Sequence, residues 1–253
     1  MPLSPRTLNF FVSDVHLGLD VSDPAAREAR FVDFLKAIPA GQTEALYMLG
    51  DIWDFWYEYK DVVPGGYVRV FAALTELVSA GVKVYFFPGN HDIWVYRYFE
   101  SLGIKVIRDR WFVTEIGGKR FCLSHGDGLG PGMYGYKFMR AVFHGRIFQI
   151  LFSTLHPRLA FGIGKAWSRH SRLAKRNKYV FKGEGEPLYT WASEVASKEK
   201  TDFVICGHYH CSYRAALPSF GELVILDDWM EGSPYLCFSP SLGLSGSFPK
   251  IEK

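Results

Sequence analysis

The chain has 253 residues, of which 48% are apolar, and a formal net charge of +3. This length and composition exclude a disordered or fibrous protein, and they are sufficient for one large α/β domain with a packed core. Because residues 1–7 lack the features of a secretory signal and no apolar run is long enough for a membrane span, we expect a cytoplasmic protein with at most peripheral membrane contact.

The first half of the chain alternates apolar strands with amphipathic helices. Four strands are predicted, at residues 8–14, 45–49, 83–87 and 104–107. Longer helices are predicted between the first three strands, at residues 24–38 and 66–80. Asp23 is the expected N-cap of the first helix, and Gly81 is the expected left-handed residue after the second. A hairpin follows at 111–123 around Gly117-Gly118, so the order predicts a mostly parallel sheet that is continued by antiparallel strands.

The pattern changes between residues 128 and 185, and we interpret this segment as a helical insertion. Large apolar residues dominate its first half, whereas its second half, residues 167–182, is a basic helix-like run. Between Asp127 and Glu184 there are eleven Lys and Arg residues and no Asp or Glu, while the rest of the chain has 18 basic and 26 acidic residues. The remaining elements are a helix at 187–197 and strands at 202–206, 212–217, 222–226 and 235–238.

Five apolar strands end in Asp, Asn or His side chains. The carboxyl ends of strands form the ligand-binding edge of an open α/β sheet, so these side chains are expected to meet at one site. Oxygen and nitrogen ligands without thiolate suit Mn²⁺, Fe or Zn²⁺. Seven ligands are too many for one tetrahedral ion and fit two ions that share a carboxylate, for which Asp51 is the natural bridge. The seven candidate ligands are Asp14, His16, Asp51, Asn90, His125, His208 and His210.

Each motif alone is also consistent with a purely structural role, because a buried His is usually a core residue and Gly-Asp after a strand is usually a turn. However, five of the eight histidines lie within these motifs, and their joint occurrence favours a metal site. His91 diverges from Asn90 and is expected to protonate the leaving oxygen or to stabilise the transition state. Asp92 is expected either to orient His91 or to cap the next helix. Asp54 is expected to support the metal ligands or the fold rather than to bind a metal ion itself.

Taken together, the motifs resemble the signature of the calcineurin-like metallophosphoesterases over residues 8–210. They are Asp14-x-His16, Gly50-Asp51-x-x-Asp54, Gly89-Asn90-His91-Asp92, His125-Gly126-Asp127 and Gly207-His208-x-His210. The resemblance implies one α/β domain over residues 1–253, a sandwich of two mixed β-sheets flanked by helices, with residues 128–185 as a helical cap. It also implies two metal ions, one held by Asp14, His16, Asp51 and His210 and the other by Asp51, Asn90, His125 and His208.

Residues 14–18 and 50–56 and the insertion after Asp127 are also similar to the UDP-2,3-diacylglucosamine pyrophosphohydrolases of lipid A biosynthesis. This similarity implies dimetal hydrolysis, with manganese expected first, of UDP-2,3-diacylglucosamine to UMP and 2,3-diacylglucosamine 1-phosphate. It further implies substrate contacts from Asn90, Tyr136 and Arg140. The expected location is the cytoplasmic face of the inner membrane, as a peripheral protein, with no stable nucleic-acid partner.

The chain departs from the better-known members of that family at two places. His91 stands where they carry Arg, and Gly130-Pro131-Gly132-Met133 stands where they carry acidic residues. Two other functions therefore stay open, namely a nucleotide phosphodiesterase or nuclease whose basic insertion follows a phosphate backbone, and a non-catalytic scaffold. For the insertion itself, the apolar side chains either bind acyl chains or pack on the core, and the basic ones meet anionic headgroups or water.

Overall fold

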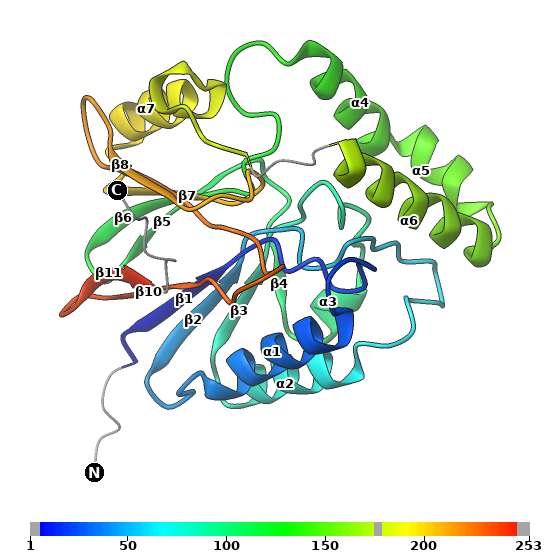
Figure 1. Ribbon diagram of the computed structural model, residues 1–253. Coiled ribbons are helices and arrows are strands. Elements are labelled where there is room, and N and C mark those ends of the chain that lie inside the picture. The colour runs from blue at the N-terminus through cyan, green and yellow to red at the C-terminus, as the bar shows by residue number, and fades with distance from the viewer. Residues whose placement is uncertain (1–5, 175–178, 247–253) are drawn as a thin grey trace.

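The structure is a computed structural model that describes residues 6–174 and 179–246. Two β-sheets pack face to face, with helices on their outer faces (Figure 1). The first sheet has the order β11-β10-β1-β2-β3-β4, and β1 to β4 run parallel in it while β10 is antiparallel to its neighbours. In the second sheet, β5-β6-β7-β9-β8, the strands β6, β7 and β9 are parallel and both edge strands are antiparallel. Both sheets are mixed, which confirms the expected sandwich.

The strands of the first sheet are β1 (Leu8–Val12), β2 (Thr43–Met48), β3 (Lys83–Phe86), β4 (Lys105–Val106), β10 (Leu236–Ser239) and β11 (Gly243–Gly246). Those of the second sheet are β5 (Phe112–Ile116), β6 (Lys119–Leu123), β7 (Phe203–Cys206), β8 (Tyr213–Ala216) and β9 (Glu222–Ile225). β11 was not predicted, because its Gly-Leu-Ser-Gly sequence lacks the apolar alternation of a strand.

The strand pattern alone predicted a single sheet that the hairpin would continue, and this prediction is wrong. The hairpin exists, and Gly117 and Gly118 have the positive φ angles, 54° and 78°, that a tight two-residue turn requires. However, β5 and β6 begin the second sheet, where β6 pairs with β7. The residue pattern of a strand shows that it is a strand but does not show which strand it pairs with.

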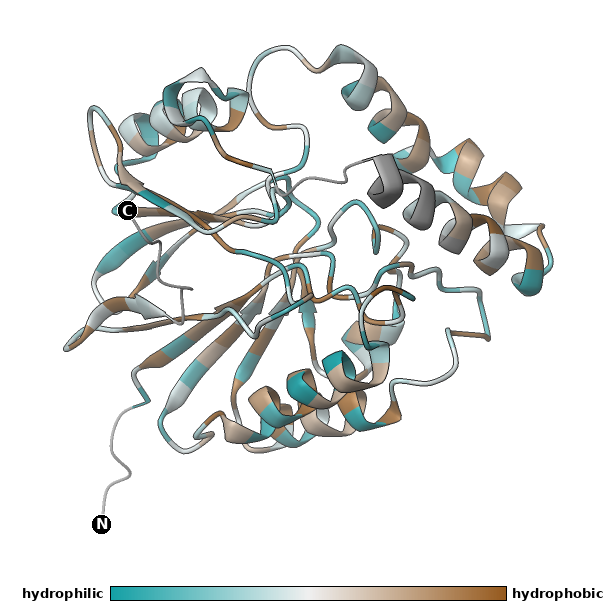
Figure 2. Cartoon of the chain, viewed as in Figure 1, coloured by the Kyte–Doolittle hydropathy of each residue, from teal (hydrophilic) through white to brown (hydrophobic). Residues whose placement is uncertain are grey.

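Alternating side chains of the central strands supply two separate layers of core. On β1, Phe10 and Val12 face the helices, whereas Phe11 faces the second sheet. Phe11 stacks on Tyr47 and Phe121 with ring centroids 5.0 Å and 5.7 Å apart. Because both faces of these strands are covered, their sequences read as nearly continuous apolar runs, and brown, hydrophobic residues recur along the strands in Figure 2.

Helices α1 (Pro24–Ala37), α2 (Val68–Ser79) and α3 (Tyr98–Ser101) pack on the first sheet, and α7 (Pro187–Glu199) packs on the second (Figure 1). Asp23 caps α1 as predicted, since its carboxylate accepts hydrogen bonds from the backbone amides of Ala25 and Ala26 at 3.1 Å and 3.0 Å. Gly81 follows α2 with a φ of 86°, which confirms the predicted left-handed residue.

Three helices of the insertion form a separate layer, called the cap below: α4 (Tyr134–His144), α5 (Arg146–Ser153) and α6 (Pro157–Ala174) (Figure 1). The predicted insertion is therefore helical, but its basic run is helical only in part. α6 ends at Ala174, residues 175–178 lie outside the described residues, and residues 179–182 are not helical. A single 3₁₀ turn, η1 (Gly183–Gly185), leads into α7.

Aromatic side chains of the core fasten the cap through its backbone carbonyls. Tyr57 donates its hydroxyl to the carbonyl of Gln149 at 3.1 Å, and Tyr59 donates to that of Leu155 at 3.0 Å. The indole of Trp94 donates to the carbonyl of Phe143 at 3.0 Å. These bonds hold α4 and α5 in place at the ends of the strands. Within residues 6–174 and 179–246, each helix is too short or too polar to cross a bilayer.

Candidate metal centre and cavity

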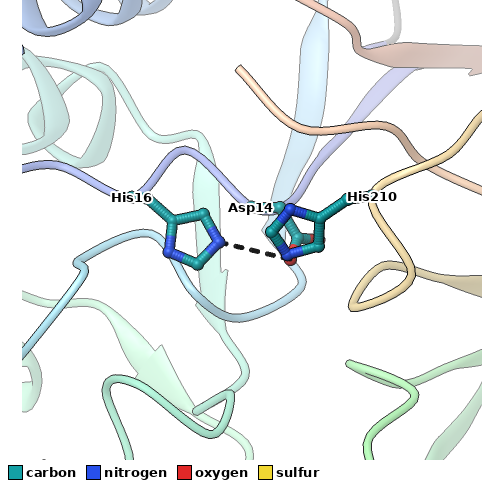
Figure 3. Close-up of side chains that lie close together, drawn as sticks. All are labelled: Asp14, His16 and His210. Atoms are coloured by element: carbon teal, nitrogen blue, oxygen red, sulfur yellow. Dashed lines mark ion pairs between the residues drawn. The ribbon is translucent and has the colours of Figure 1, made fainter. Parts of the chain in front are cut away.

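The loops that follow five strands bring all seven candidate ligands together. Three groups have a ligand atom from each member within 4.8 Å of the others. They are Asp14 with His16 and His210, His16 with Asp51 and His91, and Asp51 with His125 and His208. Asn90 joins the third group, since its Oδ1 lies 3.3 Å from Nε2 of His125. Strands from both sheets contribute, and Figure 3 shows the three side chains of the first group directed toward one another.

Asp51 lies between the groups, as a bridging carboxylate must. Its Oδ2 is 3.3 Å from Nε2 of His125 and 3.9 Å from Nε2 of His16. The Nε2 atom of His91 is also near, at 4.0 Å. Asp14 belongs to the first group only, because its Oδ1 lies 3.3 Å from Nε2 of His210 and 3.6 Å from Nε2 of His16.

Three histidine rings are oriented through their Nδ1 atoms, so that Nε2 points to the centre. Nδ1 of His125 donates to the carbonyl of Leu49 at 2.9 Å, and Nδ1 of His91 donates to the carbonyl of Asp54 at 2.8 Å, since a carbonyl can only accept. Nδ1 of His210 lies 2.8 Å from the carboxylate of Asp228. In His125 and His210, Nε2 is therefore the ring nitrogen that faces the centre and could bind a metal ion.

The backbone is strained at the same positions. Five of the seven residues have φ between 50° and 70°, in the left-handed region that side chains other than Gly seldom adopt: Asp14, His16, Asp51, His208 and His210. Such residues cost on the order of 1–3 kcal/mol each and cluster at functional sites. The neighbouring strand ends hold them there, as when His16 donates its amide to the carbonyl of Asp51 at 3.0 Å.

Two glycines allow the loops to approach the carboxylates closely. A Cβ atom at Gly89 would lie 2.2 Å from Oδ1 of Asp51, and one at Gly207 would lie 2.2 Å from Oδ2 of Asp14. No side chain fits at these distances. The glycines therefore determine how tightly the loops after β3 and β7 close on the centre.

The buried carboxylates favour cations as partners. Asp14 and Asp51 are 0% and 1% exposed, and within the described parts of the chain Oδ1 of Asp14 accepts no hydrogen bond. Burial raises the pKa of Asp14, whereas for Asp51 the effect of burial is outweighed by His125 and His91, which hold its pKa well below the usual range. Burial, together with the charge of His125, lowers the pKa of His208 to about 3, so its ring is neutral. Carboxylate oxygens and neutral imidazoles fit divalent cations.

Asp92 is part of the framework of the site. Its carboxylate accepts hydrogen bonds from four backbone amides, those of Gly89 at 2.7 Å, Asp51 at 3.2 Å, Ile52 at 2.8 Å and Trp53 at 3.2 Å. The expectation that it caps the next helix is wrong, because α3 starts at Tyr98 and its N-cap is Arg97. The hydrogen bonds also do not support the expectation that Asp92 orients His91, since the Nδ1–H of that ring is accepted by the backbone carbonyl of Asp54.

Tyr136 and Arg140, the two residues of the cap that were expected to contact the substrate, both contact the carboxylate of Asp127. Nε of Arg140 lies 2.6 Å from Oδ2 of Asp127, and the hydroxyl of Tyr136 donates to the same oxygen at 3.4 Å. Burial opposes ionisation of Asp127, but His125 and Arg140 outweigh it and lower its pKa. Both side chains still line the cavity described next.

A cavity of about 1190 Å³ connects the candidate metal centre to the cap. Asp51, Asn90, His91, His208 and His210 line one part of it. The part beneath the cap is lined by aromatic and aliphatic side chains, among them Phe55, Trp94, Phe143, Phe148, Phe152, Ile163 and Trp167. This volume exceeds the roughly 300–1000 Å³ of ordinary small-molecule sites.

The apolar residues expected to form an acyl-binding wall divide into two groups. Phe143, Phe148 and Phe152 line the cavity, and Phe152 stacks on Trp94 with ring centroids 4.6 Å apart. In contrast, Phe138, Ile147 and Leu151 lie on the outer surface of the cap and are 73%, 78% and 62% exposed. Helical periodicity separates these faces, but the sequence does not show which face points inward.

Two residues of the site were not singled out from the sequence. Asp228, which contacts His210, lies in the loop after β9 and follows no strand-end glycine motif. Ser168 of α6 donates its hydroxyl to Oδ1 of Asp54 at 2.7 Å. Ser168 and Asp54 are 114 residues apart in sequence, and no local pattern connects them.

The calcineurin-like phosphoesterase family model matches residues 10–212, which is most of the chain. The chain therefore belongs to the calcineurin-like phosphoesterase family and is a metal-dependent phosphoester hydrolase. Among curated proteins it is similar to a UDP-2,3-diacylglucosamine hydrolase from Porphyromonas gingivalis, with 33% identity over 91% of this chain and 93% of that protein. An Enterobacter protein with the same name is 31% identical over 88% of this chain and 92% of its own.

A solved structure of a dimetal phosphatase from Danio rerio covers 93% of this chain and 93% of that protein. The TM-score is 0.49 at 12% sequence identity.

Proposed function

We propose that this chain hydrolyses the pyrophosphate of UDP-2,3-diacylglucosamine, which gives UMP and 2,3-diacylglucosamine 1-phosphate. The observation that carries the proposal is the cavity of about 1190 Å³, in which polar metal-ligand candidates at one part adjoin an aromatic chamber beneath the cap. A substrate with a pyrophosphate and two acyl chains has the same division of polar and apolar parts. The printed name of the similar bacterial proteins agrees with this assignment.

In this proposal two divalent cations are the cofactors, with manganese as the first candidate and iron or zinc as alternatives. One is held by Asp14, His16, Asp51 and His210, and the other by Asp51, Asn90, His125 and His208. When bound, the cations supply Lewis acidity, which withdraws charge from the phosphoryl oxygens and lowers the pKa of water.

His91 is the proposed proton donor to the leaving oxygen. Its Nδ1–H is fixed on the carbonyl of Asp54 at 2.8 Å, so Nε2 is the atom that faces the centre. A protonated Nε2 can donate to the oxygen that leaves, and general acid catalysis of this kind contributes about 10²–10⁴-fold. Asn90 is given a substrate contact in addition to its metal contact, because its amide lines the cavity beside His91.

The cap, as residues 128–185 of a single domain over 1–253, is proposed to bind the acyl chains on its inner face. Tyr136 and Arg140 line the cavity between that chamber and His208, where they can meet the pyrophosphate or sugar. For Arg140 this contact competes with its ion pair to Asp127.

The outer face of the cap supports peripheral contact with the cytoplasmic face of the inner membrane. Tyr134, Phe138 and Ile147 are 82%, 73% and 78% exposed. The insertion also has eleven Lys and Arg residues and no acidic residue between Asp127 and Glu184. Near an anionic surface each Lys or Arg contributes about 1 kcal/mol of attraction.

The test is Mn²⁺-supported hydrolysis of UDP-2,3-diacylglucosamine, measured as UMP release, with bis-p-nitrophenyl phosphate as a small ester that does not need the acyl-binding chamber. We expect Phe148→Ala to raise KM for the lipid and to leave the small ester unaffected. Phe138→Ala is the matched control, since it removes the same ring from the outer face of the cap. It should leave hydrolysis of both substrates unchanged and should weaken only the binding of the protein to anionic lipid vesicles.

Hydrolysis of the small ester without UMP release would contradict the lipid assignment while keeping the phosphoesterase. In that case salt-sensitive cleavage of single-stranded nucleic acid would identify a nuclease. Absence of hydrolysis of every ester by the metal-loaded protein would indicate the non-catalytic scaffold.

A further inference from the structure

The carboxylate of Asp54 is shared between the cap and two histidines of the candidate metal centre. Its Oδ1 accepts the hydroxyl of Ser168 at 2.7 Å and lies 3.4 Å from Nδ1 of His16 and 3.7 Å from Nδ1 of His91. Asp54 is 3% exposed and Ser168 is 1% exposed, so both partners of this contact are buried. Ser168 belongs to α6, whereas the other three residues belong to loops at the strand ends.

A second contact seats the same helix on the next residue of the loop. Gly164 lies one turn before Ser168 and packs against the ring of Phe55, where an added Cβ would lie 2.3 Å from Cδ2. The absence of a side chain at Gly164 therefore determines how closely α6 approaches residues 54 and 55. The hydroxyl of Ser168 reaches Asp54 only at that separation.

The position of a carboxylate that backs a metal-binding histidine affects the metal centre itself. A carboxylate on Nδ1 keeps the proton there, directs Nε2 inward and makes the ring more basic. In a buried site with low dielectric, the charge of the Asp54 carboxylate acts on both rings, at 3.4 Å from Nδ1 of His16 and 3.7 Å from Nδ1 of His91, so its rotation would change the electrostatic environment of both. The hydroxyl of Ser168 supplies a donor that opposes such rotation.

We propose that Ser168 is a positioning residue, through which the seating of the cap helix α6 on Asp54 fixes the Asp54 carboxylate beside Nδ1 of His16 and of His91. The cap then contributes to turnover even for substrates that do not reach it. This inference rests on the proposed metal-binding and proton-donating roles of His16 and His91, but it does not depend on the identity of the lipid.

The test uses the full chain loaded with Mn²⁺ and bis-p-nitrophenyl phosphate, which is too small to need the acyl chamber. Ser168→Ala is expected to lower kcat about tenfold, within the range for partners of metal ligands, with KM and melting temperature nearly unchanged. Gly164→Ala should lower kcat similarly, because its methyl group pushes α6 away from Phe55.

Gly162→Ala is the matched control on the same helix. Among the residues that the structure describes, and apart from the backbone of α6 itself, no atom lies within 4 Å of a Cβ at that position. The gain in helix propensity is the same as at Gly164, so kcat should not change. A double-mutant cycle adds the critical readout. If Ser168 acts through Asp54, Ser168→Ala has no further effect on kcat in an Asp54→Ala background.

Two results would overturn the inference: an unchanged kcat in Ser168→Ala, or equal losses in the wild-type and Asp54→Ala backgrounds, which would indicate a packing role alone. Failure of the wild-type protein to hydrolyse the small ester would instead contradict the proposed function. The two failures are therefore distinguishable in one experiment.

Discussion

Oδ2 of Asp228 lies 2.8 Å from Nδ1 of His210, on the side of the ring away from Asp14. We therefore expect Asp228→Ala to weaken metal binding by about 10–100-fold, because the imidazole loses both its orientation and the carboxylate that increases its basicity. Asp228→Asn keeps an acceptor for the Nδ1 proton and should lose less. Titration of the metal-free protein with Mn²⁺ measures the effect.

Glu231→Ala is the control for this prediction, because Glu231 lies in the same loop and lines the same cavity. Its removal should leave Mn²⁺ affinity unchanged. Equal affinities of the wild type and Asp228→Ala would show that His210 does not depend on this carboxylate.

Asp92→Ala should destabilise the fold, since four backbone amides lose their acceptor when the carboxylate is removed. Leaving a buried donor unsatisfied costs about 1–3 kcal/mol, so we expect a loss of at least about 3 kcal/mol in the free energy of unfolding. Urea unfolding of the metal-free protein tests this value. Asp61→Ala, at an exposed position, should change stability by no more than about 0.5 kcal/mol.

The same variant separates two roles of Asp92. Wild-type stability together with a loss of turnover would restore the role of orienting His91, which the hydrogen bonds of the structure do not support.

Asp51→Ala is expected to remove both metal ions and all hydrolysis, because Oδ2 of Asp51 is near Nε2 of His16 and of His125, which belong to different ligand groups. Elemental analysis after gel filtration checks the metal content. Two full equivalents of metal in this variant would exclude Asp51 as the bridge.

His91→Ala should leave the metal content unchanged and slow turnover by about 10²–10⁴-fold. The ring contributes a proton rather than a required ligand in the proposed mechanism, although its Nε2 lies 4.0 Å from Oδ2 of Asp51 and within one of the three ligand groups. Elemental analysis and kcat for UMP release are the two measurements. Loss of one metal equivalent would make His91 a ligand instead.

Much of the site could be predicted from the sequence because each candidate ligand lies within four residues of the end of a strand. A short apolar run that ends in Gly-Asp or Gly-His places its polar side chain at the carboxyl edge of a sheet, whatever the neighbouring strand is. The caps of α1 and α2 were equally local, since Asp23 and Gly81 act within one turn of the helix they terminate.

Other features could not be predicted, because they depend on contacts between distant segments. The residue pattern placed the hairpin at 111–123 but could not show that β6 pairs with β7, which lies 80 residues later. Periodicity identified the apolar residues of α4 and α5 but not that Phe148 faces a cavity while Ile147 faces outward.

By itself, then, the sequence determined the chemistry of the centre, because oxygen and nitrogen ligands and strand-end glycines are properties of short stretches. Only the tertiary structure decided which groups orient those ligands. Asp228 reaches His210 from another loop, Ser168 reaches Asp54 from the cap, and Asp92 binds amides on two loops. A hydrogen bond of about 3 Å is sensitive to the packing of whole elements, and no local pattern encodes that packing.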